Sequence, residues 1–264
     1  MPKPEDIQKI VREVAALVKQ EAKATRGAVT LSPEVAEWLQ SVHESPVVYE
    51  SPAPESGAHA PHQELADELA AIDAEVRQCT QCGLNAGRRN TVFGAGNSRA
   101  DLVFVGEAPG AEEDRQGAPF VGRAGMLLTD IIVKGMKMRR EDVYICNVLK
   151  CRPPENRDPS PEEVYYCEPY LLRQLEVIQP KVICALGRIA AQTLLKTTES
   201  TGKLRGRWHS YHGIPFRVTY HPAYLLRNPA DKKKCWEDIQ EIMKVLNGES
   251  TPDMGGGLIA QRLI

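Results

Sequence analysis

The first segment with residues suited to chemistry is Gly106–Gly110, with the sequence GEAPG. It follows the apolar run 102–105, so it is expected to be a loop at the end of a buried strand. Glycines at both ends let backbone N–H groups approach a ligand closely. Taken alone, such a loop could equally bind phosphate, although it lacks the lysine of a P-loop and the spacing of a dinucleotide-binding motif.

The second segment, 117–125, has the sequence GAPFVGRAG and presents Phe120 between small neighbours. Only four phenylalanines occur in the chain. An aromatic ring on such a loop can stack on a nucleobase, which is worth roughly 1–3 kcal/mol on known stacking surfaces. The alternative is a hydrophobic plug that only fills space.

The third segment, 220–229, has the sequence YHPAYLLRNP and places His221 directly after an apolar run. An imidazole there can donate a hydrogen bond to a carbonyl oxygen that gains charge. Leu226 and Arg227 could enter a DNA duplex where a base has left, as apolar wedges do. A lone histidine is more often structural, so its interpretation depends on what lies beside it.

The cysteines form a fourth pattern. Cys79 and Cys82 make a C-x2-C pair, and Cys151 and Cys167 have 15 residues between them. Four thiolates can hold zinc or an iron–sulfur cluster, and the spacing does not distinguish the two. For Cys167 alone, plain burial is the alternative. Burial is also expected for the other three cysteines, which lie in apolar patterns: Cys146, Cys184 and Cys235.

The elements that must position these segments alternate between strands and helices. Short apolar runs predict strands at 102–105, 143–149, 182–186 and 216–220, and helical patterns occupy 126–134, 160–178, 187–196 and 232–246. This order predicts an α/β fold, a three-layer α/β/α arrangement with a mostly parallel central sheet of about four strands. Ligands bind outside the carboxyl ends of such strands. Loop 106–110, Asn147 and His221 are therefore expected to meet at one edge.

Composition and charge restrict the class of protein, its location and the kind of partner it can bind. The 264 residues are 42% hydrophobic and 26% charged, typical of a globular protein. No apolar run reaches the ~20 residues of a membrane helix, and the first residues do not form a secretory signal, so we expect a cytoplasmic protein. Residues 1–74 hold 6 basic and 13 acidic residues, which leaves the remainder with a net charge of +5. That modest positive charge suits a polyanion but does not establish one.

Three regions follow from these patterns. Residues 1–74 are expected to be an acidic, largely disordered arm with a possible short helix at 5–23 and a Pro- and Ser-rich linker at 45–63. Residues 75–246 form the folded domain, and 247–264 a flexible tail. Nothing in the arm identifies a partner for it.

The motifs GEAPG, PFVGRAG, NVLKCRPPENR and HPAYLLR, together with the four cysteines, resemble the family 4 uracil-DNA glycosylases. This is the iron–sulfur branch of the uracil-DNA glycosylase superfamily. The resemblance covers about residues 76–246. It implies a hydrolase that flips uracil, the product of cytosine deamination, out of DNA and cuts the N-glycosidic bond. The abasic site it leaves enters base excision repair.

The resemblance also implies roles for individual residues. A [4Fe–4S] cluster of structural function would be held by Cys79, Cys82, Cys151 and Cys167. Phe120 would stack on the extruded uracil and Asn147 would read its Watson–Crick edge. The first loop would line the pocket through Glu107, Ala108 and Pro109. His221 would stabilise the departing uracil anion, and the minor groove would be probed by Leu225, Leu226 and Arg227.

Water activation is assigned to Glu107, with Glu113 as the second choice. No lysine nucleophile is indicated, so no lyase step is expected. A related iron–sulfur branch attaches covalently to the abasic sugar through a histidine in an inserted basic loop. The comparable stretch here, 203–209, has no evident insertion, and Ala108 stands where that branch has glutamine, so the hydrolytic branch is favoured.

Two alternatives remain open. One is a non-catalytic iron–sulfur protein that binds DNA with the same fold, and the other is a structural module that holds zinc. The glycosylase is favoured because Glu107, Phe120, Asn147 and His221 are all present. We expect a monomer that acts on uracil-containing DNA and does not enter membranes.

Overall fold

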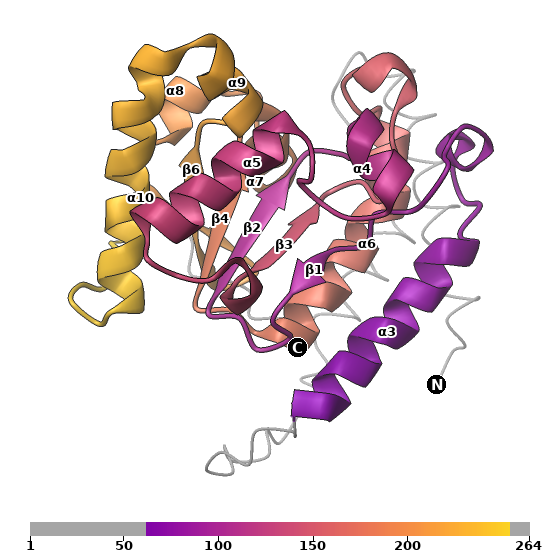
Figure 1. Cartoon of the computed structure of the whole chain (residues 1–264), viewed down its shortest axis with the longest axis horizontal. Coiled ribbons are helices and arrows are strands. Elements are labelled where there is room, and N and C mark those ends of the chain that lie inside the picture. The colour runs from indigo at the N-terminus through magenta and orange to yellow at the C-terminus, as the bar shows by residue number, and fades with distance from the viewer. Residues whose placement is uncertain (1–61, 254–264) are drawn as a thin grey trace, which may run out of the picture. The chain divides into compact units, whose positions relative to one another are not determined.

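A computed structural model describes residues 62–253. They are built around a six-stranded sheet in the order β1-β3-β2-β4-β6-β5 (Figure 1). The strands are β1 (Ala95–Gly96), β2 (Leu102–Gly106), β3 (Tyr144–Asn147), β4 (Val182–Leu186), β5 (Trp208–Tyr211) and β6 (Ile214–Thr219). Three segments lie outside the described residues: the predicted helix at 5–23, nearly all of the predicted linker at 45–63, and the residues from 254 onward.

The four central strands are those expected from the apolar runs, and they are parallel, as predicted. The two antiparallel edge strands were not predicted. β1 has only two residues, too few for a pattern. β5 carries polar residues and pairs with β6 through a two-residue turn. His212 and Gly213 both have positive φ there, 47° and 83°, as tight hairpin turns require.

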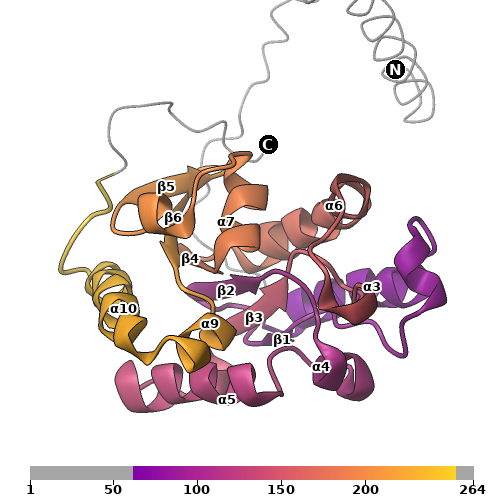
Figure 2. The ribbon, with the colours of Figure 1, turned by 90° about the horizontal axis from the view of Figure 1, so that it is seen from above.

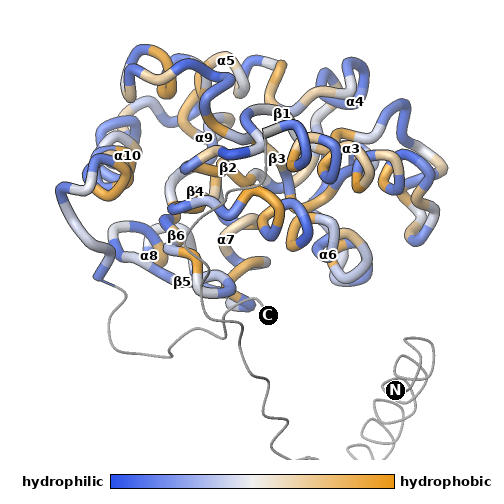
Figure 3. The backbone as a smooth tube through the Cα atoms, turned by 90° about the horizontal axis from the view of Figure 1, so that it is seen from below, coloured by the Kyte–Doolittle hydropathy of each residue, from blue (hydrophilic) through white to orange (hydrophobic). Residues whose placement is uncertain are grey.

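Alternate residues of each strand face opposite layers, which explains why the strands are apolar throughout. In β2, Val103 and Val105 belong to one buried cluster, while Leu102 and Phe104 belong to the other. Helices α3, α6 and α7 cover the first face, and α5 and α10 cover the second (Figure 2). In Figure 3, α3 and α10 alternate between hydrophobic and hydrophilic stretches, as helices covered on one side do. The three-layer prediction is confirmed.

The helix boundaries follow local signals. α6 (Pro161–Ile178) begins as predicted with a capping box, in which the Ser160 side chain accepts the Glu163 N–H and Glu163 accepts the Ser160 N–H. The remaining helical elements are α3 (His62–Gln78), η1 (Gly83–Ala86), α4 (Ala111–Gln116), α5 (Arg123–Asp130), η2 (Ile131–Gly135), η3 (Arg140–Asp142), η4 (Pro154–Asn156), α7 (Arg188–Leu195), α8 (Thr201–Leu204), α9 (Pro222–Arg227), η5 (Pro229–Asp231) and α10 (Lys232–Leu246).

Helix α3 changes the expected boundary of the N-terminal arm. The prediction placed residues up to 74 in a mostly disordered segment, but 62–74 are helical. Leu69, Ile72 and Val76 are buried against the same cluster as α6, because their three- and four-residue spacing forms one apolar stripe. Glu75 and Arg173 of α6 also form an ion pair with an N···O distance of 2.5 Å. The folded body therefore begins earlier than predicted.

The order of the strands has a switch point at β2. β3 lies on one side of β2 and β4 on the other, so the chain changes direction across the sheet at this strand. In parallel α/β sheets such a switch point is where ligands bind. Within residues 62–253, no helix is long and apolar enough to span a bilayer.

Candidate active site

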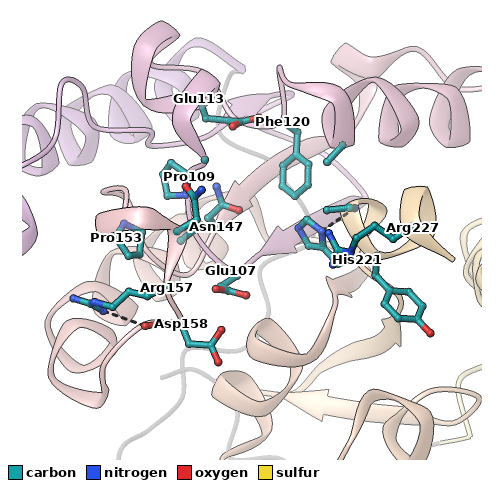
Figure 4. A pocket seen from close by; sticks show the side chains of 16 residues that line it. Glu107, Pro109, Glu113, Phe120, Asn147, Pro153, Arg157, Asp158, His221 and Arg227 are labelled. Atoms are coloured by element: carbon teal, nitrogen blue, oxygen red, sulfur yellow. Dashed lines mark hydrogen bonds between the residues drawn. The ribbon is translucent and has the colours of Figure 1, made fainter.

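A cavity of about 470 Å³ lies at the carboxyl ends of β2, β3 and β6 (Figure 4). The sequence prediction that the first loop, Asn147 and His221 meet at one edge is therefore confirmed. The cavity is lined by Glu107, Ala108, Pro109, Gly110, Glu113, Phe120, Ala124, Asn147, Pro153, Asn156, Arg157, Asp158, His221, Ala223, Tyr224 and Arg227.

The first loop continues from β2 and carries Glu107 into the cavity. Its path is held by β3, since the N–H groups of Val148 and Leu149 donate to the carbonyl oxygens of Gly106 and Glu107, each at 3.0 Å. Burial raises the pKa of the Glu107 carboxyl to about 7, and the nearby Asp158 carboxylate adds to the rise, which Arg188 opposes. Glu107 can therefore exchange a proton near neutral pH.

Phe120 is held in an unusual backbone conformation with φ of 51°. Arg140 Nη2 donates to the Phe120 carbonyl oxygen at 3.0 Å. Glu113 Oε1 accepts the N–H groups of Val121 and Gly122 at 3.0 and 2.9 Å. The loop is thus fixed on both sides of the ring, and Glu113 has a clear role in fixing it.

The Phe120 ring, the Asn147 amide and the end of β2 are in close contact. A Cβ atom at Gly106 would lie 2.7 Å from Phe120 Cζ and 2.3 Å from Asn147 Oδ1, so only glycine fits. The ring centroids of Phe120 and His221 are 5.7 Å apart. An aromatic ring, an amide and an imidazole therefore face one small space.

Asn147 ends β3 and is 1% exposed. Its Oδ1 is buried, and among the described residues it has no hydrogen-bond partner. An unsatisfied buried acceptor costs about 1–3 kcal/mol, so such atoms in native proteins call for an explanation. A ligand that donates an N–H into the cavity would satisfy it.

His221 is the N-cap residue of α9 and lines the cavity, and a hydrogen bond defines the state of its ring. Nδ1 accepts the N–H of Ala223 at 3.0 Å, so Nδ1 is unprotonated and a neutral ring carries its proton on Nε2. The pKa of His221 is lowered to about 4, chiefly by burial and also by the nearby charge of Arg227, while Glu113 opposes the decrease. The ring is therefore a neutral Nε2–H donor above that pH.

The three residues predicted to probe DNA differ in exposure. Leu226 is 38% exposed, and Arg227 is exposed and lines the cavity mouth. Leu225 is only 1% exposed and packs in the core beneath α9. A six-residue helix buries one of two adjacent leucines, which the sequence pattern could not reveal.

The loop 153–158, which was not predicted to belong to the site, forms the wall of the cavity opposite His221. Glu155 and Asn156 have positive φ, and the loop is fixed at its end by two ion pairs. Arg157 binds both Glu163 carboxylate oxygens, at 2.9 and 2.6 Å, and Asp158 pairs with Arg188 at 2.7 Å.

The proline-rich sequence RPPENRDPS after Cys151 was the available signal for this wall. The stretch 203–209, considered as the counterpart of a covalent-branch loop, does not line this cavity.

The four predicted cluster ligands line a second, small and mostly apolar cavity. Cys79 directly follows α3, Cys82 directly precedes η1, Cys151 lies in the loop after β3, and Cys167 lies in α6. Arg88 Nη1 donates to Cys151 Sγ and the Lys150 N–H donates to Cys167 Sγ, both at 3.2 Å. N–H donors to sulfur suit thiolates that ligate a metal group. As the side chains stand in residues 62–253, no three His, Cys, Asp or Glu groups could hold a single metal ion.

The other three cysteines, Cys146, Cys184 and Cys235, are buried, as predicted.

Comparison with known proteins agrees with this geometry. Residues 93–240 match the family model of the uracil DNA glycosylase superfamily. The chain is 44% identical over 191 residues to the type-4 uracil-DNA glycosylase of Saccharolobus solfataricus, covering 69% of this chain and 88% of that protein. It is 47% identical over 191 residues to the type-4 enzyme of Thermotoga maritima, covering 69% and 97%. A type-5 enzyme of Pyrobaculum aerophilum is 33% identical over 165 residues, covering 56% and 72%.

This chain is a member of the uracil DNA glycosylase superfamily. Its higher identity to the type-4 proteins than to that type-5 protein groups it with the type-4 branch.

The state of His221 can be tested directly. Because burial lowers its pKa to about 4, the ring should stay neutral from pH 5 to pH 8, with the proton on Nε2. Long-range ¹H–¹⁵N NMR spectra across this pH range should show one unchanging tautomer. The exposed His212 offers an internal comparison in the same spectra. Titration of His221 near the ordinary value of about 6.5 would contradict the assignment.

Proposed function

We propose that this chain is a uracil-DNA glycosylase that binds an extruded uracil in the 470 Å³ cavity and hydrolyses its N-glycosidic bond, leaving an abasic site. The observation that carries the proposal is the meeting of Glu107, Phe120, Asn147 and His221 around that one cavity. The names of the type-4 relatives agree with this activity. Extrusion of the base costs a few kcal/mol, which contacts in the cavity offset.

Base recognition rests on Phe120 and Asn147. The phenyl ring offers a face for stacking, and the amide offers one acceptor and one donor. Uracil presents the matching pair, because its N3–H can donate to the unsatisfied Asn147 Oδ1 and its O4 can accept from Nδ2. The same interactions disfavour cytosine, which has no N3–H and carries a donor at the position of O4.

Bond cleavage needs stabilisation of negative charge on the base. When the bond breaks, the sugar becomes oxocarbenium-like and the electron pair leaves with uracil, whose O2 gains charge. The Nε2–H of His221 can donate to that oxygen. A neutral donor fixed by Ala223 needs no rearrangement during the reaction, which is the general advantage of a preorganised site.

Glu107 is proposed to take the proton of the attacking water. Its carboxylate faces the cavity, and its pKa of about 7 keeps a large fraction of it ionised at neutral pH. Glu113 is less suited, because its carboxylate already accepts two backbone N–H groups. Among the described residues no lysine lines the cavity, which supports hydrolysis without a lyase step.

DNA is proposed to lie across α9, with Leu226 entering the space left by the base and Arg227 near the backbone. Both residues are exposed, and Arg227 also lines the cavity. An apolar wedge beside a cation is a common arrangement for holding a distorted duplex.

The four thiols are proposed to hold a [4Fe–4S] cluster through Cys79, Cys82, Cys151 and Cys167. They surround one cavity, although they are not grouped closely enough for a single ion, and Arg88 offsets part of the negative charge. When bound, the cluster supplies structural cross-linking. It would tie the end of α3 to the loop after β3 and to α6.

The activity is tested with a uracil-containing oligonucleotide, followed by alkali to cut at abasic sites. The wild-type protein should release uracil, whereas Asn147→Asp should lower the single-turnover rate at least about 100-fold, since a carboxylate cannot donate to O4. A carboxylate can accept from the N4 amino group of cytosine, so a matched cytosine oligonucleotide is run in parallel. Release of uracil by Asn147→Asp at the wild-type rate would contradict the role of the amide.

The role of Glu107 predicts a pH dependence. A carboxyl with a raised pKa is an active base only above that pKa, so the single-turnover rate should rise with pH and level off above about 7. Asp158→Asn removes a carboxylate that raises this pKa and frees Arg188, which lowers it, so the midpoint should move to lower pH. Glu107→Gln should lose the rise altogether. A midpoint that Asp158→Asn leaves unmoved would contradict the assignment.

The cluster proposal is tested by spectroscopy and metal analysis. Wild-type protein purified without oxygen should contain iron and absorb broadly near about 400 nm. Cys167→Ser should lose most of this absorbance and much of its soluble yield, while Cys235→Ala, a buried cysteine outside the thiol cavity, should keep both. Zinc in place of iron in the wild-type protein would contradict the cluster.

A further inference from the structure

Lys150 is a buried lysine that the proposed chemistry does not use. It is 1% exposed, lines the thiol cavity and forms a hydrogen bond with Asn147, which lines the active-site cavity. Burying an amino group is unfavourable unless its hydrogen bonds are satisfied, and an apolar side chain would fill the space more easily. A lysine at this position therefore calls for an explanation.

The amino group of Lys150 has two defined acceptors. Nζ donates to the main-chain oxygen of Asn147 at 2.7 Å and to Gln174 Oε1 at 2.5 Å. It also lies 5.8 Å from the centre of the Phe93 ring. The side chain therefore bends back three residues to hold the end of β3 against α6.

Gln174 is itself fixed, so it can serve as an anchor. Its Nε2 donates to the Phe93 carbonyl oxygen and to the Tyr144 hydroxyl, both at 3.0 Å. These bonds turn Oε1 toward Lys150. The chain of contacts runs from the core of α6 through Lys150 to the peptide of Asn147.

Lys150 holds the peptide of Asn147, and the residues that follow this peptide contact the first loop of the site. Val148 and Leu149, the next two residues, donate to the carbonyl oxygens of Gly106 and Glu107. The position of the Asn147 peptide therefore sets the direction of its own amide and supports the loop that carries Glu107.

We propose that Lys150 is a positioning residue for uracil recognition, which holds the Asn147 main chain so that the side-chain amide faces the base. This inference rests on the proposed glycosylase function and deepens it. The Lys150 peptide N–H, which donates to Cys167 Sγ, is a separate contact and remains when only the side chain is changed. A side-chain substitution therefore separates the base-reading role from the thiol site.

The test compares Lys150→Met with Gln174→Met in the full-length, iron-loaded protein. Both replace buried members of one network, but only Lys150→Met removes the bond to Asn147. The readouts are inhibition by free uracil, kcat/KM on a uracil oligonucleotide, affinity for abasic-site DNA, absorbance near about 400 nm and thermal stability.

Lys150→Met should weaken inhibition by free uracil and lower kcat/KM by about tenfold or more, because small displacements of positioning groups have effects of this size. Its affinity for abasic DNA and its absorbance should stay unchanged. Gln174→Met removes the anchor but keeps the Lys150–Asn147 bond, so it should lower thermal stability and weaken uracil inhibition clearly less than Lys150→Met does.

Unchanged uracil inhibition in Lys150→Met overturns the proposal, and so does an equal loss in Gln174→Met, which would indicate general loosening. If Lys150→Met does not fold, the double variant Lys150→Met/Gln174→Met is used, because it removes both polar partners together. Unchanged inhibition of this variant by free uracil overturns the proposal. Failure of the proposed function is distinguishable, because wild-type protein would then release no uracil.

Discussion

The site depends on two parallel strands that end at the same level. Gly106 of β2 lies opposite Asn147 of β3, so the loop after one strand and the amide at the end of the other open on the same crevice. The missing side chain at Gly106 lets the Phe120 ring and the Asn147 amide approach each other. A side chain at this position would displace one of them, and the cavity would lose either the aromatic ring or the amide from its wall.

Around this strand pair, each functional group is held by the backbone or by buried polar contacts. Ala223 fixes the imidazole of His221, Glu113 fixes the loop of Phe120, and Lys150 holds the peptide of Asn147. Catalysis by preorganised dipoles needs this kind of support, since groups that must reorient during the reaction contribute less. Lys150 also lines the thiol cavity, so the proposed cluster site and the proposed uracil site share one segment of chain.

The sequence predicted the central part of this arrangement well. Four apolar runs marked the parallel strands, and the capping box at Ser160 marked the start of α6, because these signals are local. The meeting of Glu107, Asn147 and His221 followed from the rule that parallel strands share a carboxyl edge. The residues of the thiol cavity followed from cysteine spacing and the family resemblance.

Features that depend on tertiary packing were not predicted. Leu225 and Leu226 look alike in sequence, and only the packing of α9 decides which is buried. The wall at 153–158 depends on two ion pairs, one from Arg157 to Glu163 and one from Asp158 to Arg188, which lies 30 positions away. The buried Lys150 has no sequence signal, because its partner Gln174 lies 24 positions away.

The left-handed backbone of Phe120 determines whether the free-energy cost of ordering its loop arises on folding or on ligand binding. Such a conformation is unfavourable by about 1–3 kcal/mol and persists only where the surroundings impose it. Here Arg140 and Glu113 impose it, and Gly125 leaves room for the Phe120 carbonyl. The free-energy costs of the strained backbone and of ordering the loop are therefore incurred when the chain folds, before any ligand binds. In the proposed function, an extruded nucleotide therefore binds to a surface that is already ordered, and its binding energy remains available for distorting the DNA.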